Sequence, residues 1–298
     1  MSLVKVNKEE GFAAGFYFGH RKNELNPRMK PYVFSTRNGI SLIDLDQTIE
    51  KVQEACEVVS QMVADGKKIL FVGTKNQAKK VVEEEAKRAE MLYVTNRWLG
   101  GTLTNYTTIK ASIERMKKLE SFKESPQWRE IPKKEQSQCE RALERSKKYL
   151  QGIQEMKTLP GALFIIDVKK EHIAVNEANK LGIPVIAVVD TNCDPLPITH
   201  VIPGNDDAIR SIQLFTQLIA EACLEGRRIY QEKLYAEGQE KDLFVEEEKK
   251  ERQESRFEGD IDLQGLDAAD LALQEKELQV GEEDTGSKTS SSEENNIE

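Results

Sequence analysis

Three short apolar runs constrain the fold of this 298-residue chain more than any other feature of its sequence. Residues 68–73, 162–167 and 184–190 are almost uninterrupted apolar stretches of strand length. Such runs are typical of strands that are buried on both faces, as in a parallel sheet. Amphipathic helical patterns lie between them, and Gly66 and Gly182 stand where helices are expected to end. The alternation predicts an α/β domain with a parallel sheet flanked by helices.

A different pattern interrupts this alternation between residues 105 and 157. Residues 105–121 and 133–157 have helical apolar periodicity and are joined by a short, proline-containing connection. Residues 110–157 carry a net charge of +5. One interpretation is a solvated charged face on a two-helix coil. The other is a protruding α-helical hairpin, a coiled coil inserted into the α/β domain that docks on a large anionic partner.

Charge is unevenly distributed along the chain. The formal net charge is -9, but residues 231–298 carry -14, so residues 1–230 carry +5. A basic body is compatible with a nucleic-acid partner, and the acidic tail indicates a solvated or regulatory appendage whose end is disordered. The predicted organisation is an N-terminal arm and β-hairpin (1–45), an α/β core domain (46–104 and 158–230), an inserted helical hairpin (105–157) and an acidic, partly helical to disordered tail (231–298).

The N-terminal arm combines aromatic and basic side chains. Residues 15–32 have no helical period and read as irregular chain. Cations that neutralise phosphates and rings that stack on bases would suit an RNA surface. The same rings could instead pin the arm to its own core, and both interpretations can hold together. Asn38-Gly39, between two β-rich runs, predicts a β-hairpin.

The run from Arg97 to Asn105 joins a predicted strand at 91–95 to the first helix of the insertion. Its paired glycines allow a tight bend, and a helix that begins near Asn105 offers free N–H groups to an anion. Trp98 could stack on a partner or could simply be a core residue. An ordinary strand-to-helix turn that mounts the helical hairpin accounts for all of these residues.

Five aspartates fall at predicted strand ends or in the nearby loops: Asp167, Asp190, Asp194, Asp206 and Asp207. In an open parallel sheet ligands bind at that edge, so these carboxylates could hold Mg²⁺. The structural alternative, which we favour, is that they cap helices, pair with Lys or Arg and order the loops. We therefore expect no metal site here.

Catalytic signatures are weak. The turn at Gly73 lacks phosphate-loop spacing, and Cys193 has no recognisable partnering signature with a histidine. The four cysteines form no CxxC pair, which argues against a zinc knuckle or a disulfide framework. No apolar run approaches 18 residues, so we expect a soluble cytoplasmic protein without a membrane partner. The sequence argues against an enzyme and indicates no cofactor.

Six motifs occur in an order that resembles a known family. They are FGH–NPRMKPYVF (18–34), RNGISLIDL (37–45), ILFVGTK (69–75), RWLGGTLTN (97–105), DTNCDP (190–195) and IPGNDDAIRSI (202–212). Together they resemble bacterial or organellar ribosomal protein S2, over about residues 13–228. An ordered set of this length is far more specific than any single motif.

The resemblance implies a flavodoxin-like three-layer fold and no catalytic activity. It also implies contact with the rRNA of the small ribosomal subunit, and no contact with DNA. A further implied role is to hold another protein of that subunit, a large one that captures mRNA. The competing hypothesis is a nucleotide- or sugar-phosphate-binding α/β enzyme that uses the strand-end aspartates. Carried over by position, the expected RNA-facing residues are His20, Arg21, Arg28, Lys30, Arg97, Asn105, Lys110, Arg115, Lys117 and Lys118.

Overall fold

The computed structural model describes residues 7–129 and 131–236 of the chain. The chain divides into two compact units, Met1–Lys233 and Leu234–Glu298, and the architecture below is that of the first unit. Most of the predicted acidic tail, from residue 237 onward, lies outside the described residues.

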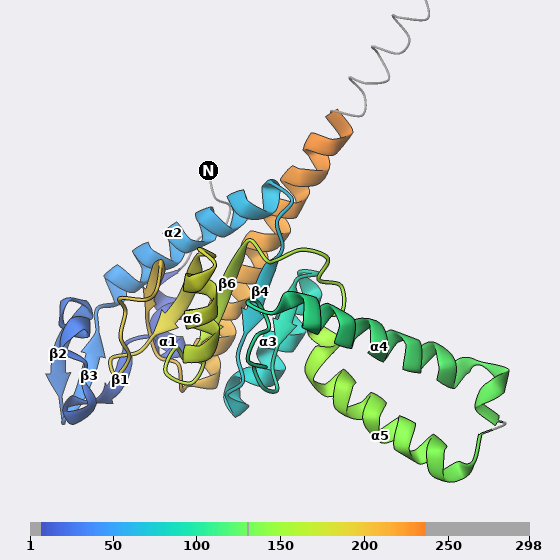
Figure 1. Cartoon of the computed structure of the whole chain (residues 1–298). Helices are drawn as coiled ribbons and strands as arrows, with labels where there is room; N and C mark the ends of the chain where they lie inside the picture. Colours follow the sequence, from blue (N-terminus) through green and yellow to red (C-terminus); the bar gives the residue numbers. More distant parts are fainter. Residues whose placement is uncertain (1–6, 130, 237–298) are drawn as a thin grey trace, which may run out of the picture. The chain divides into compact units, whose positions relative to one another are not determined.

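A five-stranded parallel sheet forms the centre of the fold (Figure 1). Its strand order is β5-β4-β6-β7-β8. The second strand along the chain, β5, thus lies at one edge, beside β4, and the remaining strands continue on the other side of β4 in chain order. This is the flavodoxin-like order, and it confirms the predicted fold class. The strands are β4 (Ile69–Val72), β5 (Leu92–Val94), β6 (Ala162–Ile166), β7 (Val185–Val189) and β8 (His200–Pro203).

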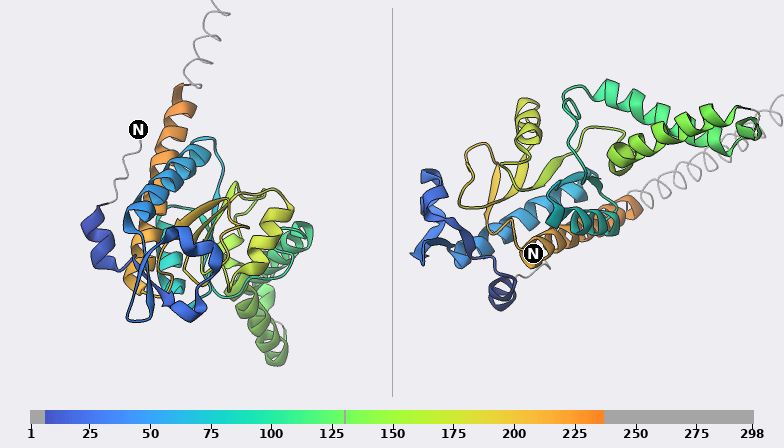
Figure 2. Two further views of the ribbon diagram at one scale, coloured as in Figure 1. Left: turned by 90° about the vertical axis from the view of Figure 1, so that its left-hand side faces the viewer. Right: turned by 90° about the horizontal axis from the view of Figure 1, so that it is seen from below.

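Helices cover both faces of the sheet because successive strand residues point to opposite sides. Ile69 and Phe71 belong to one hydrophobic cluster, whereas Leu70 and Val72 belong to another. The first cluster lies under α2 (Leu45–Ala64), α3 (Asn76–Arg88) and the helix that begins at residue 209. The second lies under α6 (His172–Lys180) and the first half of α4 (Tyr106–Glu124), which gives the three layers seen in Figure 2.

The N-terminal segment forms a second, antiparallel sheet of order β1-β3-β2. Asn38 and Gly39 have φ of 52° and 76°, which confirms the predicted hairpin. The prediction of an irregular arm before the hairpin was wrong, because residues 18–21 form a strand that pairs with β3. The elements are α1 (Lys8–Ala14), β1 (Phe18–Arg21), short 3-10 turns at Lys22–Glu24 and Pro27–Tyr32, β2 (Val33–Arg37) and β3 (Ile40–Ile43).

Helices α4 and α5 (Lys133–Leu150) pack against each other in antiparallel fashion and extend from the sheet (Figure 1). Ion pairs cross between them, from Lys123 to Glu140 at 2.9 Å and from Lys147 to Glu120. The insertion occupies the connection between β5 and β6.

The second helix of the insertion ends earlier than the periodicity predicted. It stops at Leu150, and a 3-10 turn, Gln151–Ile153, follows. At this turn two backbones approach closely, since a Cβ at Gly152 would lie 2.0 Å from the carbonyl oxygen of Tyr93. The chain thus returns to the sheet beside the strand that it left.

Candidate nucleic-acid interface

The loop before α4 is folded around one buried carboxylate, that of Glu177 on α6. The indole Nε1 of Trp98 donates to Oε1 at 3.0 Å, and the Gly101 N–H donates to the same oxygen at 2.7 Å. The other oxygen accepts the N–H groups of Leu103 at 3.0 Å and Thr104 at 3.1 Å, and the Thr104 hydroxyl at 3.1 Å. The anion expected at this helix start is therefore supplied by the chain itself.

The pKa of Glu177 shows that the hydrogen bonds from the loop stabilise its charged form. Burial raises the pKa of this carboxyl, but hydrogen bonds from Trp98, Thr104, Gly101 and Leu103 outweigh burial and hold the pKa below its usual value. Trp98 is 5% exposed, so the interpretation of it as a core residue is confirmed. These hydrogen bonds hold residues 98–104, called the mount below, against α6. The mount leads directly into α4 and fixes where that helix starts.

A second buried carboxylate, Glu171, fills the turn after β4. Its Oε1 accepts the N–H of Thr74 at 3.1 Å and the Thr74 hydroxyl, while Lys170 Nζ donates to the Thr74 carbonyl at 2.9 Å. Burial raises the pKa of Glu171, and the bonds from Thr74 oppose that rise. A nucleotide phosphate would need these same donors, so the turn gives no support to a nucleotide-binding enzyme.

Lys75 compensates three of the strand-end aspartates. Its ammonium nitrogen lies 2.9 Å from Asp206, 2.5 Å from Asp207 and 3.6 Å from Asp167. Burial lowers the pKa of Lys75, but the hydrogen bond and charges of these carboxylates raise it above the ordinary value. Burial, reinforced by the charge of Asp190, raises the pKa of Asp206 to about 7 despite Lys75. The structural interpretation of the aspartates agrees with this geometry.

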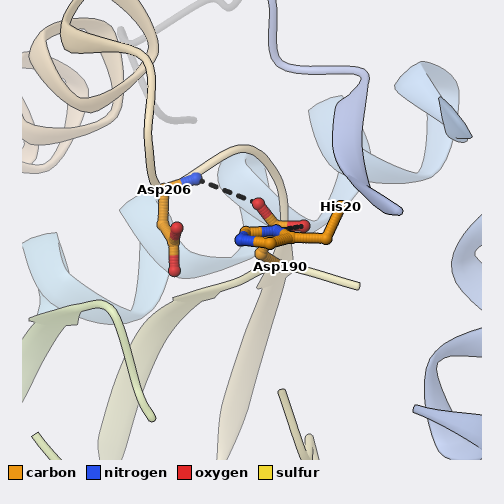
Figure 3. Close-up of side chains that lie close together, drawn as sticks. All are labelled: His20, Asp190 and Asp206. Carbon is orange, nitrogen blue, oxygen red and sulfur yellow. Dashed lines mark hydrogen bonds and ion pairs between the residues drawn. The ribbon is translucent and has the colours of Figure 1, made fainter. Parts of the chain in front are cut away.

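His20 lies inside the same acidic cluster (Figure 3). Its Nδ1 is 3.0 Å from Asp190 and its Nε2 is 3.3 Å from Asp207. The hydrogen bond with Asp190 raises the pKa of His20 to about 9, although burial opposes this. His20, Asp190 and Asp206 each offer a ligand atom, all within 4.8 Å of one another, so they could hold a metal ion. The absence of a metal therefore stays a prediction.

The remaining aspartate of this edge is also paired. Asp194 lies 2.5 Å from Arg28 and accepts the N–H of Leu196 at 3.1 Å. Its neighbour Cys193 is 2% exposed, and burial raises the pKa of its thiol to about 12. A buried thiol that stays protonated is a poor nucleophile. The Cys193 thiol therefore gives no support to nucleophilic catalysis.

The expected RNA-facing residues fall into separate regions of the fold. His20, Arg21, Arg28 and Lys30 belong to the N-terminal segment, and Arg97 and Asn105 flank the mount. Asn105 precedes α4 and accepts from the Thr108 hydroxyl at 2.9 Å, so it is engaged locally. All are exposed except His20, which is half-buried, and the members on α4, all exposed, are Lys110, Arg115, Lys117 and Lys118.

Lys110, Arg115 and Lys118 differ in their partners from two other hairpin lysines, Lys123 near the end of α4 and Lys147 on α5. Lys123 and Lys147 are held by glutamates across the hairpin. Among the described residues no carboxylate pairs with Lys110, Arg115 or Lys118. Exposed, unpaired cations of this kind are available to phosphates. Sequence reasoning missed Lys75, Glu171 and Glu177 as organising residues, because each looks like an ordinary charged residue of a solvated helix.

These features define a class: an α/β protein whose ligand edge is filled by its own ion pairs and whose inserted hairpin carries free positive charge. Within the described residues, no helix combines the length and apolar character needed to cross a bilayer. The sequence model of the family "Ribosomal protein S2" matches residues 12–226. The chain is also 51% identical, over 254 residues, to the small ribosomal subunit protein uS2 of Borrelia duttonii (strain Ly), covering 85% of this chain and 100% of that relative.

The chain belongs to the ribosomal protein S2 family. Members of this family are structural proteins and not enzymes, which agrees with the filled phosphate turn and the buried thiol. The alternative of a nucleotide- or sugar-phosphate-binding enzyme is unsupported.

Proposed function

We propose that the outer face of α4 binds small-subunit rRNA through its phosphates. The chain is a structural constituent of the small ribosomal subunit, which associates with rRNA and with other ribosomal proteins. In bacteria this subunit lies in the cytoplasm. The observation that carries the proposal is the set of exposed α4 cations, Lys110, Arg115 and Lys118, which have no carboxylate partner among the described residues.

The mount supports this assignment because it makes the hairpin a fixed extension of the α/β unit. Glu177 joins α6 to the residues before α4 through five hydrogen bonds. At the other end of the insertion, Asn96 Nδ2 donates to the carbonyl of Lys148 at 2.7 Å. A surface held at both ends loses little conformational entropy when it docks. Arg97, exposed beside this mount, belongs to the same proposed RNA-facing surface.

The test is a salt titration of binding to small-subunit rRNA. The triple variant Lys110→Ala/Arg115→Ala/Lys118→Ala removes three cations, and each phosphate contact contributes about 0.7–0.9 to the slope of log K against log salt. We expect the slope to fall by about 2 to 3. The matched control is Lys123→Ala/Lys147→Ala, on the same hairpin, and it should bind nearly as the parent does. Equal slopes for the triple variant and the parent would refute the proposal.

For the large protein that captures mRNA, we propose the N-terminal sheet as the holding surface. Phe34 on β2 is 77% exposed and Phe18 on β1 is 44% exposed. Tyr17 packs on Phe18 with ring centroids 4.2 Å apart, and Phe12 stacks on Tyr17 at 4.8 Å. Exposed aromatic groups are typical anchors at protein interfaces. Phe34→Ala should reduce retention of that protein on purified small subunits while rRNA binding stays unchanged, and loss of both together would contradict the assignment.

A further inference from the structure

A lysine-lined pocket opens at the amino edge of the parallel sheet, opposite the acidic cluster. Its volume is about 620 Å³, which is within the range of small-molecule sites. Four lysines line it: Lys67 and Lys68 just before β4, Lys117 on α4, and Lys157 on the chain that returns from α5. Three segments distant in sequence thus bring positive charge to one place.

The positive charge of this pocket is compensated only in part among the described residues. Glu155 also lines it and lies 3.7 Å from Lys68, but that carboxylate is 72% exposed. Within residues 7–129 and 131–236, no carboxylate pairs with Lys67, Lys117 or Lys157. Like charges that line one hollow focus a positive potential into it, which attracts an anion.

The walls of the pocket are fixed in position. A Cβ at Gly161 would lie 2.6 Å from the Cβ of Lys67, so the Lys67 stem rests directly on the backbone beside it. The Tyr106 hydroxyl donates to the carbonyl of Met156, which ties the start of α4 to the residue before Lys157. Leu159, which is 40% exposed, contributes apolar lining. The ammonium groups suit the phosphate of a nucleotide, and the exposed apolar surface beside them suits the face of its base.

The pocket also continues the proposed RNA-binding face of α4. Lys110 and Lys117 are seven residues apart, which places them on the same side of the helix about 10 Å apart along its axis. A nucleic-acid backbone that follows this face reaches the pocket at Lys117. This continuity favours RNA over an isolated small anion.

We propose that this pocket receives a nucleotide of small-subunit rRNA, with its phosphate among Lys67, Lys117 and Lys157. The inference rests on the proposed function of α4 and extends it to residues outside the hairpin. It assigns Lys67, just before β4, and Lys157, at the end of the insertion, to RNA binding.

The test compares the full-length chain with the variant Lys67→Ala/Lys157→Ala in salt titrations of rRNA binding. We expect the slope of log K against log salt to fall by about 0.7 to 0.9, since the one phosphate placed among the three lysines loses two of its cations. The matched control is Lys169→Ala/Lys180→Ala, which removes two exposed lysines outside the pocket. A pocket variant with the parent's slope would overturn the inference.

A second measurement is independent of any effect of substitution on folding. Acetylation of lysines by a small reagent is followed by mass spectrometry in the free parent chain, with rRNA alone and in assembled small subunits. We expect Lys67, Lys117 and Lys157 to be protected by rRNA alone. Protection of Lys110 and Lys118 without the pocket lysines would overturn the inference and leave the proposed function standing.

Two other outcomes are equally informative. If no α4 or pocket lysine is protected by rRNA, the proposed function fails together with the inference. If the pocket lysines are protected in assembled subunits but not by rRNA alone, an acidic segment of a neighbouring protein occupies the pocket, and the RNA assignment is overturned.

Discussion

The two edges of the parallel sheet carry charge of opposite sign, and they differ in how much of that charge is paired within the protein. At the carboxyl edge, Asp167, Asp206 and Asp207 surround Lys75, and His20 bridges Asp190 and Asp207. At the amino edge, lysines line a pocket that holds one exposed glutamate. Ligands of open α/β sheets bind at the carboxyl edge, yet here that edge is occupied by the chain's own ion pairs. The amino edge, whose charge is largely unpaired, is therefore the better candidate for a binding site than the carboxyl edge, where this fold class usually binds its ligands.

The largest expected effect tests the compensated edge. Lys75→Ala removes the ammonium group that three carboxylates share. Asp207 keeps His20 as a partner, whereas Asp206, which is 3% exposed, has no other ion pair among the described residues. Removing one partner of a buried ion-pair network costs about 3 to 5 kcal/mol, and the exposure of Asp207 places this site at about 3. Urea unfolding measures the loss. Adding Asp206→Asn in the same chain should restore part of the stability; if it restores none, Lys75 does not act by compensating charge.

The next effect concerns the mount of the hairpin. Glu177→Gln keeps an oxygen acceptor but removes the charge that five donors share. Charge-assisted hydrogen bonds to a buried group contribute about 1.5 to 3 kcal/mol, so we expect a loss of about 2. Hydrogen exchange should accelerate in residues 97–104 more than in the central strands. Uniform acceleration across the unit would show that Glu177 acts on the whole core and not on the mount.

A smaller effect tests whether His20 is charged. The pKa of His20 is raised from 6.5 to about 9, so its stabilising contribution is complete below pH 6.5 and is lost as the pH rises through 9. Allowing for its partial exposure, we expect unfolding free energy to fall by about 1 to 2 kcal/mol between pH 7 and 9.5. Asp206, whose pKa is about 7, is half titrated at the lower end of this window, so its loss of a proton adds to the decline below about pH 8, and the decline above pH 8 reports on His20.

The control for this pH profile is His20→Gln, which should remove most of the decline. Both proteins are measured with EDTA, because His20, Asp190 and Asp206 could hold a metal ion. A parent profile that changes when EDTA is omitted and Zn²⁺ is added would reveal ion binding at this cluster. An identical decline in the variant would mean that another group titrates there.

The smallest effect sharpens the contrast between the edges. Lys67→Ala/Lys157→Ala removes two lysines that have no carboxylate partner among the described residues, so the free energy of unfolding should change by less than about 0.5 kcal/mol. Relief of repulsion could even make the change favourable. Loss of as much stability as in Lys75→Ala, measured by the same urea unfolding, would show that the amino-edge lysines are structural.

The sequence predicted the centre of this fold well, because β4, β6 and β7 are apolar runs that no other element explains. It missed β8, which is only four residues long, is half-exposed over its first two residues, and includes Pro203. It also missed β1, in which a glycine and two basic residues hide the alternation. Short strands at sheet edges are stabilised by the strands with which they pair. The hydrophobic pattern of the edge strand's own residues does not reveal those partners.

The organising charges of the candidate sites were less predictable for a related reason. Glu177 lies 73 to 79 residues from its donors, and Lys75 lies 131 residues from Asp206. In the sequence each is one more charged residue near or within an amphipathic helix. The pocket lysines come from three separate segments, so their convergence is a property of the topology and not of any motif.

The contact between Gly152 and Tyr93 has a consequence for how this family can vary. The insertion leaves the sheet after β5 and returns against the carbonyl of Tyr93, in that same strand. Its two ends are therefore neighbours, whatever the length of the helices between them. Since closing a longer loop adds little entropic cost, whole helical turns can be gained or lost at the tip without displacing a strand. The reach of the hairpin is thus open to natural selection, while the sheet that carries it stays unchanged.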